Sequence, residues 1–272
     1  MKKKLLSVLL SATMVASLLV GCGGGGAAAG GSDAAAPAAT DDAAAPAADT
    51  SAAGGKKVGV SMPTKDLQRW NQDGSNMEAK LKEAGYEVDL QFASNDVQTQ
   101  LGQVENMISS GCNVLVIAAI EGSSLGEALG QAKEAGIPVI AYDRLLMDSD
   151  AVSYYATFDN YKVGQVQAQY VIDTLDLDNA DGPFNIEFTA GDPGDNNAGF
   201  FFNGAMDLLK PYIDEGKLNV VSGQTKFEDV ATPTWGTDVS QKRAENILST
   251  YYADGTELDV WLCSNDSTAL GV

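Results

Sequence analysis

Short apolar runs alternate with amphipathic segments along the chain from residue 57 onward. Continuous apolar runs predict buried β-strands, and apolar residues spaced three or four apart predict helices. The pattern predicts strands over 57–62, 86–92, 113–119, 137–142 and 154–158, and helices over 70–84, 97–110 and 125–135. Two of these helices end in Glu-Ala-Gly, where glycine favours termination of a helix. The repetition indicates one βα unit used several times.

A second series of alternating elements follows the first. It comprises predicted helices over 161–175, 198–209 and 239–252, and predicted strands over 184–189, 218–223 and 258–263. Apolar strands between amphipathic helices are typical of a parallel sheet covered on both faces. We therefore expect an α/β fold with two doubly wound parallel-sheet lobes, residues 56–158 and 159–272, joined by a hinge near Asp159. Residues 265–272 have the pattern of a helix start without an end, so we expect the second lobe to be incomplete and the sequence truncated at its C-terminus.

The first 21 residues have a different pattern, with three lysines followed by an apolar run from 5 to 20. This pattern is typical of a secretory signal peptide, and the apolar run is too short for a membrane-spanning helix. The Leu-Val-Gly-Cys sequence at 19–22 resembles the bacterial lipobox, in which the signal is cleaved before a cysteine that carries a lipid. We therefore expect Cys22 to be lipidated and the mature protein to be extracytoplasmic and anchored to the bacterial cell membrane. The alternative is an ordinary signal peptide with an incidental cysteine.

Residues 22–55 predict a linker after this cysteine. From residue 23 the segment consists of glycine, alanine and other small or polar residues and lacks large apolar side chains, until two lysines follow. Such a segment cannot offset the entropy of ordering by burial, so we expect it to be disordered. As a flexible coil it would span about 30 Å, enough to separate a folded domain from a membrane.

Charge and composition exclude several function classes. The formal charge is −20, and removal of three lysines with the signal peptide would make it −23. An acidic surface argues against nucleic acid as a partner. The chain has no histidine, which removes the commonest metal ligand and general base, and we expect no cofactor and no metal. The aspartates at 176, 178 and 181 do not have the spacing of a calcium loop. We expect Cys112 and Cys263 to be free thiols in apolar surroundings.

Candidate binding residues follow the ends of the predicted strands, where open parallel sheets bind ligands. These positions carry amide, carboxylate, guanidinium and indole side chains: Arg69, Trp70, Asp143, Arg144, Asn196, Asn197, Trp235, Asn265 and Asp266. The polar groups suit adjacent hydroxyls, and tryptophan covers the apolar face of a sugar ring. From position alone, Asp143 and Arg144 could also be a surface pair or a structural bridge at the hinge, and residues 195–197 only a turn. We place Trp235 in a loop, where we expect it to be exposed, and residues 200–202 and Trp261 in the core.

Several motifs resemble those of the periplasmic sugar-binding proteins of ABC transporters, which have the type I bilobal fold. They are Arg69-Trp70, the segment 141–144, the segment 154–160, Asp195-Asn196-Asn197-Ala198 and Asn203-Gly204-Ala205-Met206. The likeness covers essentially all of 57–272, and it is strongest to the multiple-sugar-binding receptors and the xylose-binding protein.

The resemblance implies a role for most of the candidate residues. Arg69 would contact a ring hydroxyl or the ring oxygen, and Asp143 and Arg144 would bind adjacent hydroxyls. Trp70 would be the neighbouring aromatic residue, facing either the sugar or the wall of the first lobe. From the second lobe, Asn197 with Asn196 beside it and Asn265 would bind further hydroxyls, and Trp235 would stack on the ring. Asp266 is a candidate by position. The family's remaining contacts would lie on later segments.

The sequence therefore favours a monomeric, lipid-anchored receptor that binds a monosaccharide, an aldopentose or aldohexose, by hinge closure and delivers it to the permease subunits of an ABC importer. A sugar sensor for a membrane chemoreceptor or kinase is equally compatible. A sugar-active enzyme such as a glycosidase would need a second acid beside Asp143, for which Glu121 and Asp266 are the available positions. A transcriptional regulator of the same bilobal type disagrees with the signal and with the acidic charge.

Overall fold

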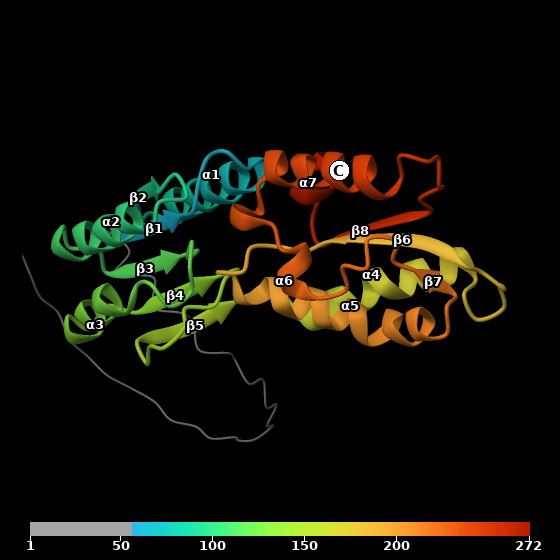
Figure 1. The fold of residues 1–272 in the computed structure, drawn as a ribbon. Coiled ribbons are helices and arrows are strands. Elements are labelled where there is room, and N and C mark those ends of the chain that lie inside the picture. Colours follow the sequence, from blue (N-terminus) through green and yellow to red (C-terminus); the bar gives the residue numbers. More distant parts are fainter. Residues whose placement is uncertain (1–55) are drawn as a thin grey trace, which may run out of the picture. The chain divides into compact units, whose positions relative to one another are not determined.

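The computed structural model describes residues 56–272 (Figure 1). The predicted signal peptide, Cys22 and the linker to residue 55 lie outside the described residues. Strands and helices alternate through the described part in nearly the predicted order. No helix within 56–272 is long and apolar enough to cross a membrane.

The first sheet has five parallel strands in the order β2-β1-β3-β4-β5. The strands are β1 (Lys57–Met62), β2 (Glu87–Phe92), β3 (Val114–Ile117), β4 (Val139–Tyr142) and β5 (Val152–Ala156). Three helices connect the first four of them: α1 (Gln68–Glu83), α2 (Val97–Ser109) and α3 (Gly126–Glu134). This order places the start of α1 and the end of β4 at the same edge of the sheet, because all the strands run in one direction.

Both faces of this sheet are covered, as the apolar strands predict. Successive side chains of a strand point to opposite faces. In β3, Leu115 and Ile117 pack into a core with α2 and α3, whereas Val116 packs into a core that contains Trp70 of α1. The predicted doubly wound arrangement is therefore confirmed for this sheet.

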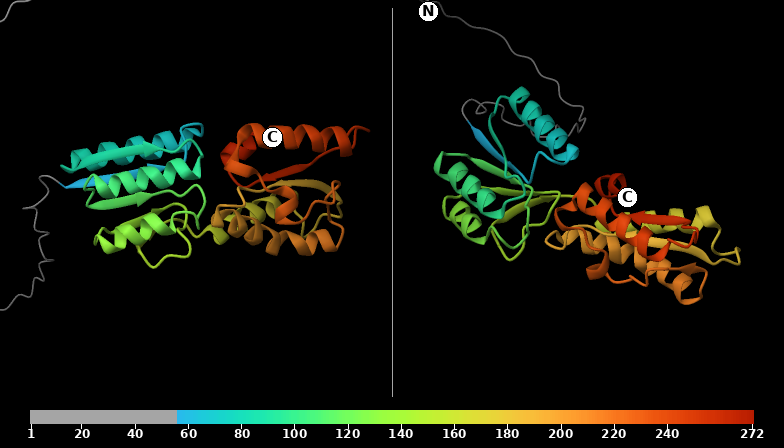
Figure 2. Two further views of the ribbon diagram at one scale, coloured as in Figure 1. Left: turned by 60° about the vertical axis from the view of Figure 1, so that its left-hand side comes forward. Right: turned by 45° about the horizontal axis from the view of Figure 1, so that its top comes forward.

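The second sheet has three parallel strands in the order β7-β6-β8. They are β6 (Phe184–Thr189), β7 (Leu218–Asn219) and β8 (Val260–Cys263), with helices α4 (Asn160–Leu175), α5 (Asn196–Asp214), α7 (Thr237–Tyr251) and α8 (Asp266–Gly271). Ile186 and Phe188 pack against α4 and α5, and α7 lies on the opposite face (Figures 1 and 2). The α/β fold with parallel sheets is confirmed, and the boundary between lobes at residue 158 stays a prediction.

A buried carboxylate binds the segment that follows β7, which is shorter than predicted. Glu187 of β6 accepts hydrogen bonds from the Ser222 backbone nitrogen at 2.9 Å, the Ser222 hydroxyl at 2.6 Å and the Tyr252 hydroxyl at 2.9 Å. The pKa of Tyr252 is raised, first by burial and then by this carboxylate. The backbone turns after Asn219, with Gly223 N–H donating to the Val220 oxygen at 2.8 Å, and Ser222 donates to the Glu187 side chain, so β7 ends before the predicted residue 223.

The chain also contains elements that the sequence did not predict. A short helix α6 (Phe227–Val230) and a 3-10 turn η1 (Pro233–Trp235) lie between β7 and α7. Helix α5 continues through Pro211 to Asp214, beyond the predicted end at 209. Cys112 and Cys263 are free thiols, as expected.

Candidate functional site

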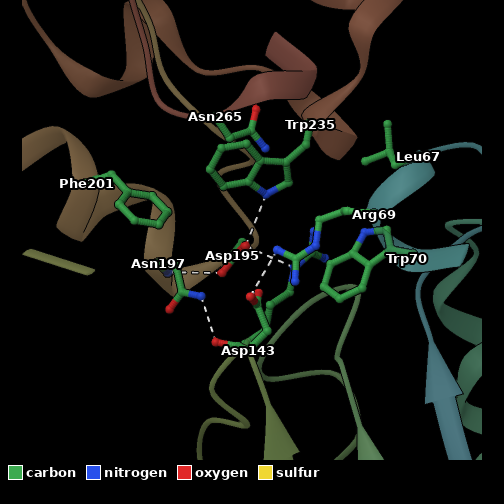
Figure 3. A pocket seen from close by; sticks show the side chains of 10 residues that line it. Leu67, Arg69, Trp70, Asp143, Asp195, Asn197, Phe201, Trp235 and Asn265 are labelled. Carbon is green, nitrogen blue, oxygen red and sulfur yellow. Dashed lines mark hydrogen bonds and ion pairs between the residues drawn. The ribbon is translucent and has the colours of Figure 1, made fainter. Parts of the chain in front are cut away.

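One pocket contains side chains that follow strands of both sheets (Figure 3). It is lined by Leu67, Arg69, Trp70, Asp143, Arg144, Asp195, Asn197, Phe201, Trp235 and Asn265. The structure therefore brings together all the predicted ligand-binding residues except Asn196 and Asp266. Each lining residue lies beyond the carboxyl end of a strand, where parallel sheets present their loops and helix starts.

Arg69 lies in the first turn of α1 between two carboxylates. Its Nη1 is 3.0 Å from Oδ2 of Asp143, and its Nη2 is 2.6 Å from Oδ2 of Asp73. Burial acts to lower the pKa of Arg69, but the charges of Asp143 and Asp73 outweigh it, so the pKa is raised. Arg69 remains a permanent cation at the pocket and can donate in a fixed fork.

Trp70 supports two guanidinium groups. Its side chain is buried, with 2% of the residue exposed. The guanidinium carbon of Arg69 lies 4.1 Å from the centroid of the indole ring, and that of Arg144 lies 5.2 Å away. These distances are in the range of cation–π attraction. Trp70 is thus part of the wall that positions the two arginines.

Asp143 directly follows β4 in a left-handed conformation, with a φ of 63°. Its backbone oxygen accepts hydrogen bonds from Asn197 Nδ2 at 2.8 Å, Thr157 Oγ1 at 3.0 Å and the Tyr155 hydroxyl at 3.2 Å. Aspartate tolerates this conformation better than most residues. The three donors fix the backbone, and the carboxylate points toward Arg69 (Figure 3).

Arg144 forms a buried ion pair with Asp195. Arg144 is 6% exposed, and its Nε lies 3.0 Å from Oδ2 of Asp195. The contact is one of charge rather than an aligned hydrogen bond, because the Nε–H finds no acceptor in bonding geometry. Nη1 donates to the backbone oxygens of Ala119 at 2.9 Å and Ile120 at 3.3 Å. The pKa of Asp195 is raised by its burial, which Arg144 opposes only in part.

Asp195 caps α5 and orients Trp235. Its Oδ1 accepts from the Asn197 backbone nitrogen at 3.0 Å, and its Oδ2 accepts from Trp235 Nε1 at 3.0 Å. Asp195 belongs to the motif 195–198 but was not among the predicted binding residues. Its cap spacing, two residues before Asn197, was the available signal.

The side chain of Asn197 bridges segments that are far apart in the sequence. Its Oδ1 accepts from Asn160 Nδ2 at 2.9 Å and from the Tyr155 hydroxyl at 3.2 Å, while its Nδ2 donates to the backbone oxygen of Asp143. Asn197 lines the pocket as predicted, and in this structure its amide links the end of β4 to the starts of α4 and α5.

Trp235 is buried, which corrects the prediction of an exposed loop residue. It is 4% exposed, lies in η1 with a φ of 54°, and its ring meets Phe201 edge to face with centroids 6.2 Å apart. A Cβ at Gly191 would overlap the indole ring, so the absence of a side chain there makes room for it. The position of Phe201 is also a correction, because Phe201 lines the pocket while Phe202 lies in the core.

The remaining candidates lie in three places. Asn265 lines the pocket and caps α8, where its Oδ1 accepts from the Thr268 backbone nitrogen at 2.9 Å. Asn196 lines a separate pocket with Phe158, and Asp266 lines another with Thr237. The described residues contain no group of three or more Asp, Glu or Cys arranged to hold a metal ion.

Known proteins share both sequence and fold with the chain. The profile of the periplasmic binding protein domain matches residues 58–272. The multiple sugar-binding periplasmic receptor ChvE of Rhizobium radiobacter is 51% identical over 215 residues, which cover 79% of this chain and 60% of that protein. The D-xylose-binding periplasmic protein of Escherichia coli is 37% identical with the same coverage. The chain thus spans about 60% of the length of these relatives.

A solved structure supports the same assignment. An ABC transporter solute binding protein from Clostridium phytofermentans, with bound β-D-glucose, has 68% sequence identity and a TM-score of 0.78, over 79% of this chain and 67% of that one. A second solute binding protein, from Chloroflexus aurantiacus in complex with D-glucose, has 33% identity and a TM-score of 0.69. The chain belongs to the periplasmic binding protein domain family.

Proposed function

We propose that this protein is a lipid-anchored extracytoplasmic receptor that binds an aldopentose or aldohexose and delivers it to an ABC importer. One observation carries the proposal: a single pocket combines the charged pair Arg69 and Asp143 from the first sheet with Trp235 and Asn265 from the second. A sugar needs this combination of hydrogen-bonding groups and an apolar wall. The names and bound sugars of the similar proteins support it.

The chemistry of the pocket assigns a role to each side of the ligand. The Asp143 carboxylate accepts from two neighbouring hydroxyls, and Arg69 donates to a hydroxyl or the ring oxygen. Asn265 both donates and accepts, and Trp235 with Phe201 covers the apolar C–H face. A sugar that leaves one of these buried groups unpaired loses about 1–3 kcal/mol of binding free energy, which is how epimers are distinguished.

Hinge closure is the proposed mechanism. A ligand that contacts Arg69 and Asp143 on one side and Trp235 and Asn265 on the other favours the conformation in which both sets reach it. The importer would then recognise this liganded conformation. Cys22 would keep the receptor beside the importer, and the protein would act as a monomer.

A binding role fits the pocket carboxylates better than a glycosidase role. Asp143 is paired with Arg69, and Asp195 with Arg144. A carboxylate paired with Arg69 accepts hydroxyl protons in hydrogen bonds but is poorly suited to donate a proton to a leaving group. Asp195 is buried, and both of its oxygens already accept hydrogen bonds, from the Asn197 backbone nitrogen and from the Trp235 indole. Glu121 and Asp266, the candidates for a second acid, do not line this pocket.

The test is a titration with a monosaccharide panel that includes D-glucose and D-xylose, followed by tryptophan fluorescence and by calorimetry. We expect saturable binding of at least one sugar, with a fluorescence change that is lost in Trp235→Phe while calorimetric binding is weakened. A folded protein that gives no heat and no fluorescence change with any sugar would overturn the receptor proposal. Lipidation is tested separately, by mass spectrometry of the N-terminal peptide and by membrane fractionation of Cys22→Ser.

A further inference from the structure

Asp73 is a second carboxylate paired with Arg69, at the other terminal nitrogen of the guanidinium from the one that contacts Asp143. It occupies the second turn of α1, four residues after Arg69, and does not line the pocket. Its Oδ2 lies 2.6 Å from Nη2 of Arg69, and the side chain is 24% exposed. The sequence pattern does not single out this residue, because an Arg and an Asp four residues apart on a helix usually form an exposed ion pair that contributes little to stability.

The two ends of the Arg69 fork have different partners. Nη1 is directed to Asp143, and Nη2 is directed to Asp73. The indole ring of Trp70 covers the guanidinium face at 4.1 Å. A sugar that binds Asp143 competes for the Asp143–Nη1 contact, whereas the Asp73–Nη2 contact lies outside the pocket and persists.

We infer that Asp73 is a positioning residue for ligand binding: it fixes the Arg69 fork against Trp70, so that Nη1 is already aimed into the pocket when a sugar arrives. The inference rests on the proposed function, because it assigns Arg69 to the sugar. An arginine has many rotamers, and ordering such a side chain on binding lowers affinity by about two- to tenfold. Asp73 removes that loss from the binding step, because the side chain is ordered beforehand.

The surroundings of Asp73 support a defined position for its carboxylate. The Asp73 side chain is three-quarters buried, and its charge acts, after burial, to raise the pKa of Tyr142 at the end of β4. Gly74, the next residue, is buried, and a Cβ there would lie 3.0 Å from the Phe92 ring. This close packing fixes the turn of α1 that carries Asp73.

The experiment compares Asp73→Asn with a matched control on the same helix. Glu78 pairs with Lys82 at 2.7 Å, also four residues apart, and neither residue lines the pocket. With D-glucose or the best sugar of the panel as probe, Asp73→Asn should weaken affinity about fivefold. Glu78→Gln should leave it unchanged, and Asp73→Glu should restore part of the loss. Urea unfolding of each variant shows whether stability changes.

A cycle with Arg69→Lys separates positioning from direct contact. If Asp73 acts through the Arg69 fork, adding Asp73→Asn to Arg69→Lys should change affinity less than about twofold, because the fork is already absent. An undiminished fivefold loss in that background would show that Asp73 acts on the sugar by itself and would overturn the inference. So would an Asp73→Asn protein that binds as tightly as the wild type.

A measurement without sugar keeps the inference separate from the proposed function. Phenylglyoxal modifies accessible guanidinium groups, and peptide mapping by mass spectrometry reports the rate at Arg69. We expect this rate to rise several-fold in Asp73→Asn and to stay at the wild-type value in Glu78→Gln. If the wild type binds no sugar, the proposed function fails, and an unchanged rate at Arg69 would independently overturn the positioning role.

Discussion

The Nε of Arg144 lies 3.0 Å from Oδ2 of Asp195, and both side chains are almost completely buried. The pair joins the residue that follows Asp143 in the first sheet to the cap of α5 in the second. Burial of two charges is costly, and here the cost is offset by the backbone oxygens around Arg144 and by the Trp235 indole that donates to Asp195. Each partner therefore depends on the other.

Removing one partner of this pair should be strongly destabilising. Asp195→Ala leaves a buried guanidinium uncompensated, and we expect the free energy of unfolding to fall by about 3–5 kcal/mol. The control is Asp214→Ala, which breaks an exposed pair with Lys210 on the same helix and should cost less than about 1 kcal/mol. Urea unfolding followed by circular dichroism measures both. Equal losses of unfolding free energy in the two variants would show that the buried pair contributes no more to stability than the exposed pair.

The raised pKa of Asp195 gives a pH dependence of defined sign. Burial is the main cause, and the charge of Asp143 adds to it, while Arg144, the Asn197 backbone and the Trp235 indole oppose it. The folded state therefore binds a proton more readily than the unfolded state, whose pKa is near 3.8. Between that value and the higher folded pKa, the contribution of Asp195 to stability increases as the pH falls.

The comparison is between the wild type and Asp195→Asn, which has no proton to bind at this position. Other aspartates with lowered pKa, such as Asp96 and Asp150, contribute with the opposite sign in both proteins. The stability difference, wild type minus variant, should therefore become more favourable to the wild type as the pH is lowered toward 4. A difference that is independent of pH, measured by urea unfolding at several pH values, would contradict the raised pKa.

The helix pair α4 and α5 depends on a glycine at the contact. A Cβ on Gly204 would overlap the backbone oxygen of Tyr161, whereas a Cβ on Gly199 of the same helix meets nothing within 4 Å. Gly204→Ala should therefore destabilise the protein by about 1–3 kcal/mol. Gly199→Ala should stabilise it by about 0.5–1 kcal/mol, because alanine is the better helix former. Thermal unfolding of the two variants checks the opposite signs.

The polar residues of the pocket were predictable from sequence because they follow strands of parallel sheets. Arg69, Asp143 and Asn265 all lie next to strand ends, and parallel strands bring those ends to one edge. The apolar part of the pocket was not predictable in the same way. Phe201 and Phe202 are adjacent on α5, and which of them faces the core depends on how α5 packs on its neighbours.

The burial of Trp235 shows why longer-range packing escapes local reasoning. The sequence around it contains Pro233 and Gly236 and is typical of an exposed loop. Its indole is buried because Gly191, far away in the sequence, leaves room for the ring and because Asp195 accepts from Nε1. Neither contact can be recognised from the residues next to Trp235 in the sequence. The contact of Ser222 with Glu187 is likewise not visible locally, since Glu187 lies on another strand.

The two thiols of the described residues should be unreactive in the folded protein. Burial raises the pKa of Cys263 to about 11, and burial also raises that of Cys112. At pH 8 only about one Cys263 side chain in a thousand is then a thiolate, the reactive form. In the Cys22→Ser background, Ellman's reagent should titrate both cysteines rapidly only after unfolding in guanidinium chloride. Rapid labelling of Cys263 in the native protein would show that its surroundings are more open than described.

Asp143 permits a test that separates its charge from its backbone conformation. Asparagine tolerates a positive φ about as well as aspartate, so Asp143→Asn should keep the backbone that Asn197, Thr157 and Tyr155 stabilise. It removes the carboxylate that would accept two sugar hydroxyls and leaves Arg69 without its pocket partner. We expect sugar affinity to fall about 10- to 100-fold, because a hydrogen bond to a charged group is worth about 1.5–3 kcal/mol.

Asp143→Ala should lose at least as much affinity and additionally lose stability, because alanine is strained at this φ. Calorimetric titration together with urea unfolding distinguishes the two effects. Unchanged affinity in Asp143→Asn would show that the Asp143 carboxylate does not bind the sugar. It would also mean that the contact with Asp73 alone positions the Arg69 side chain.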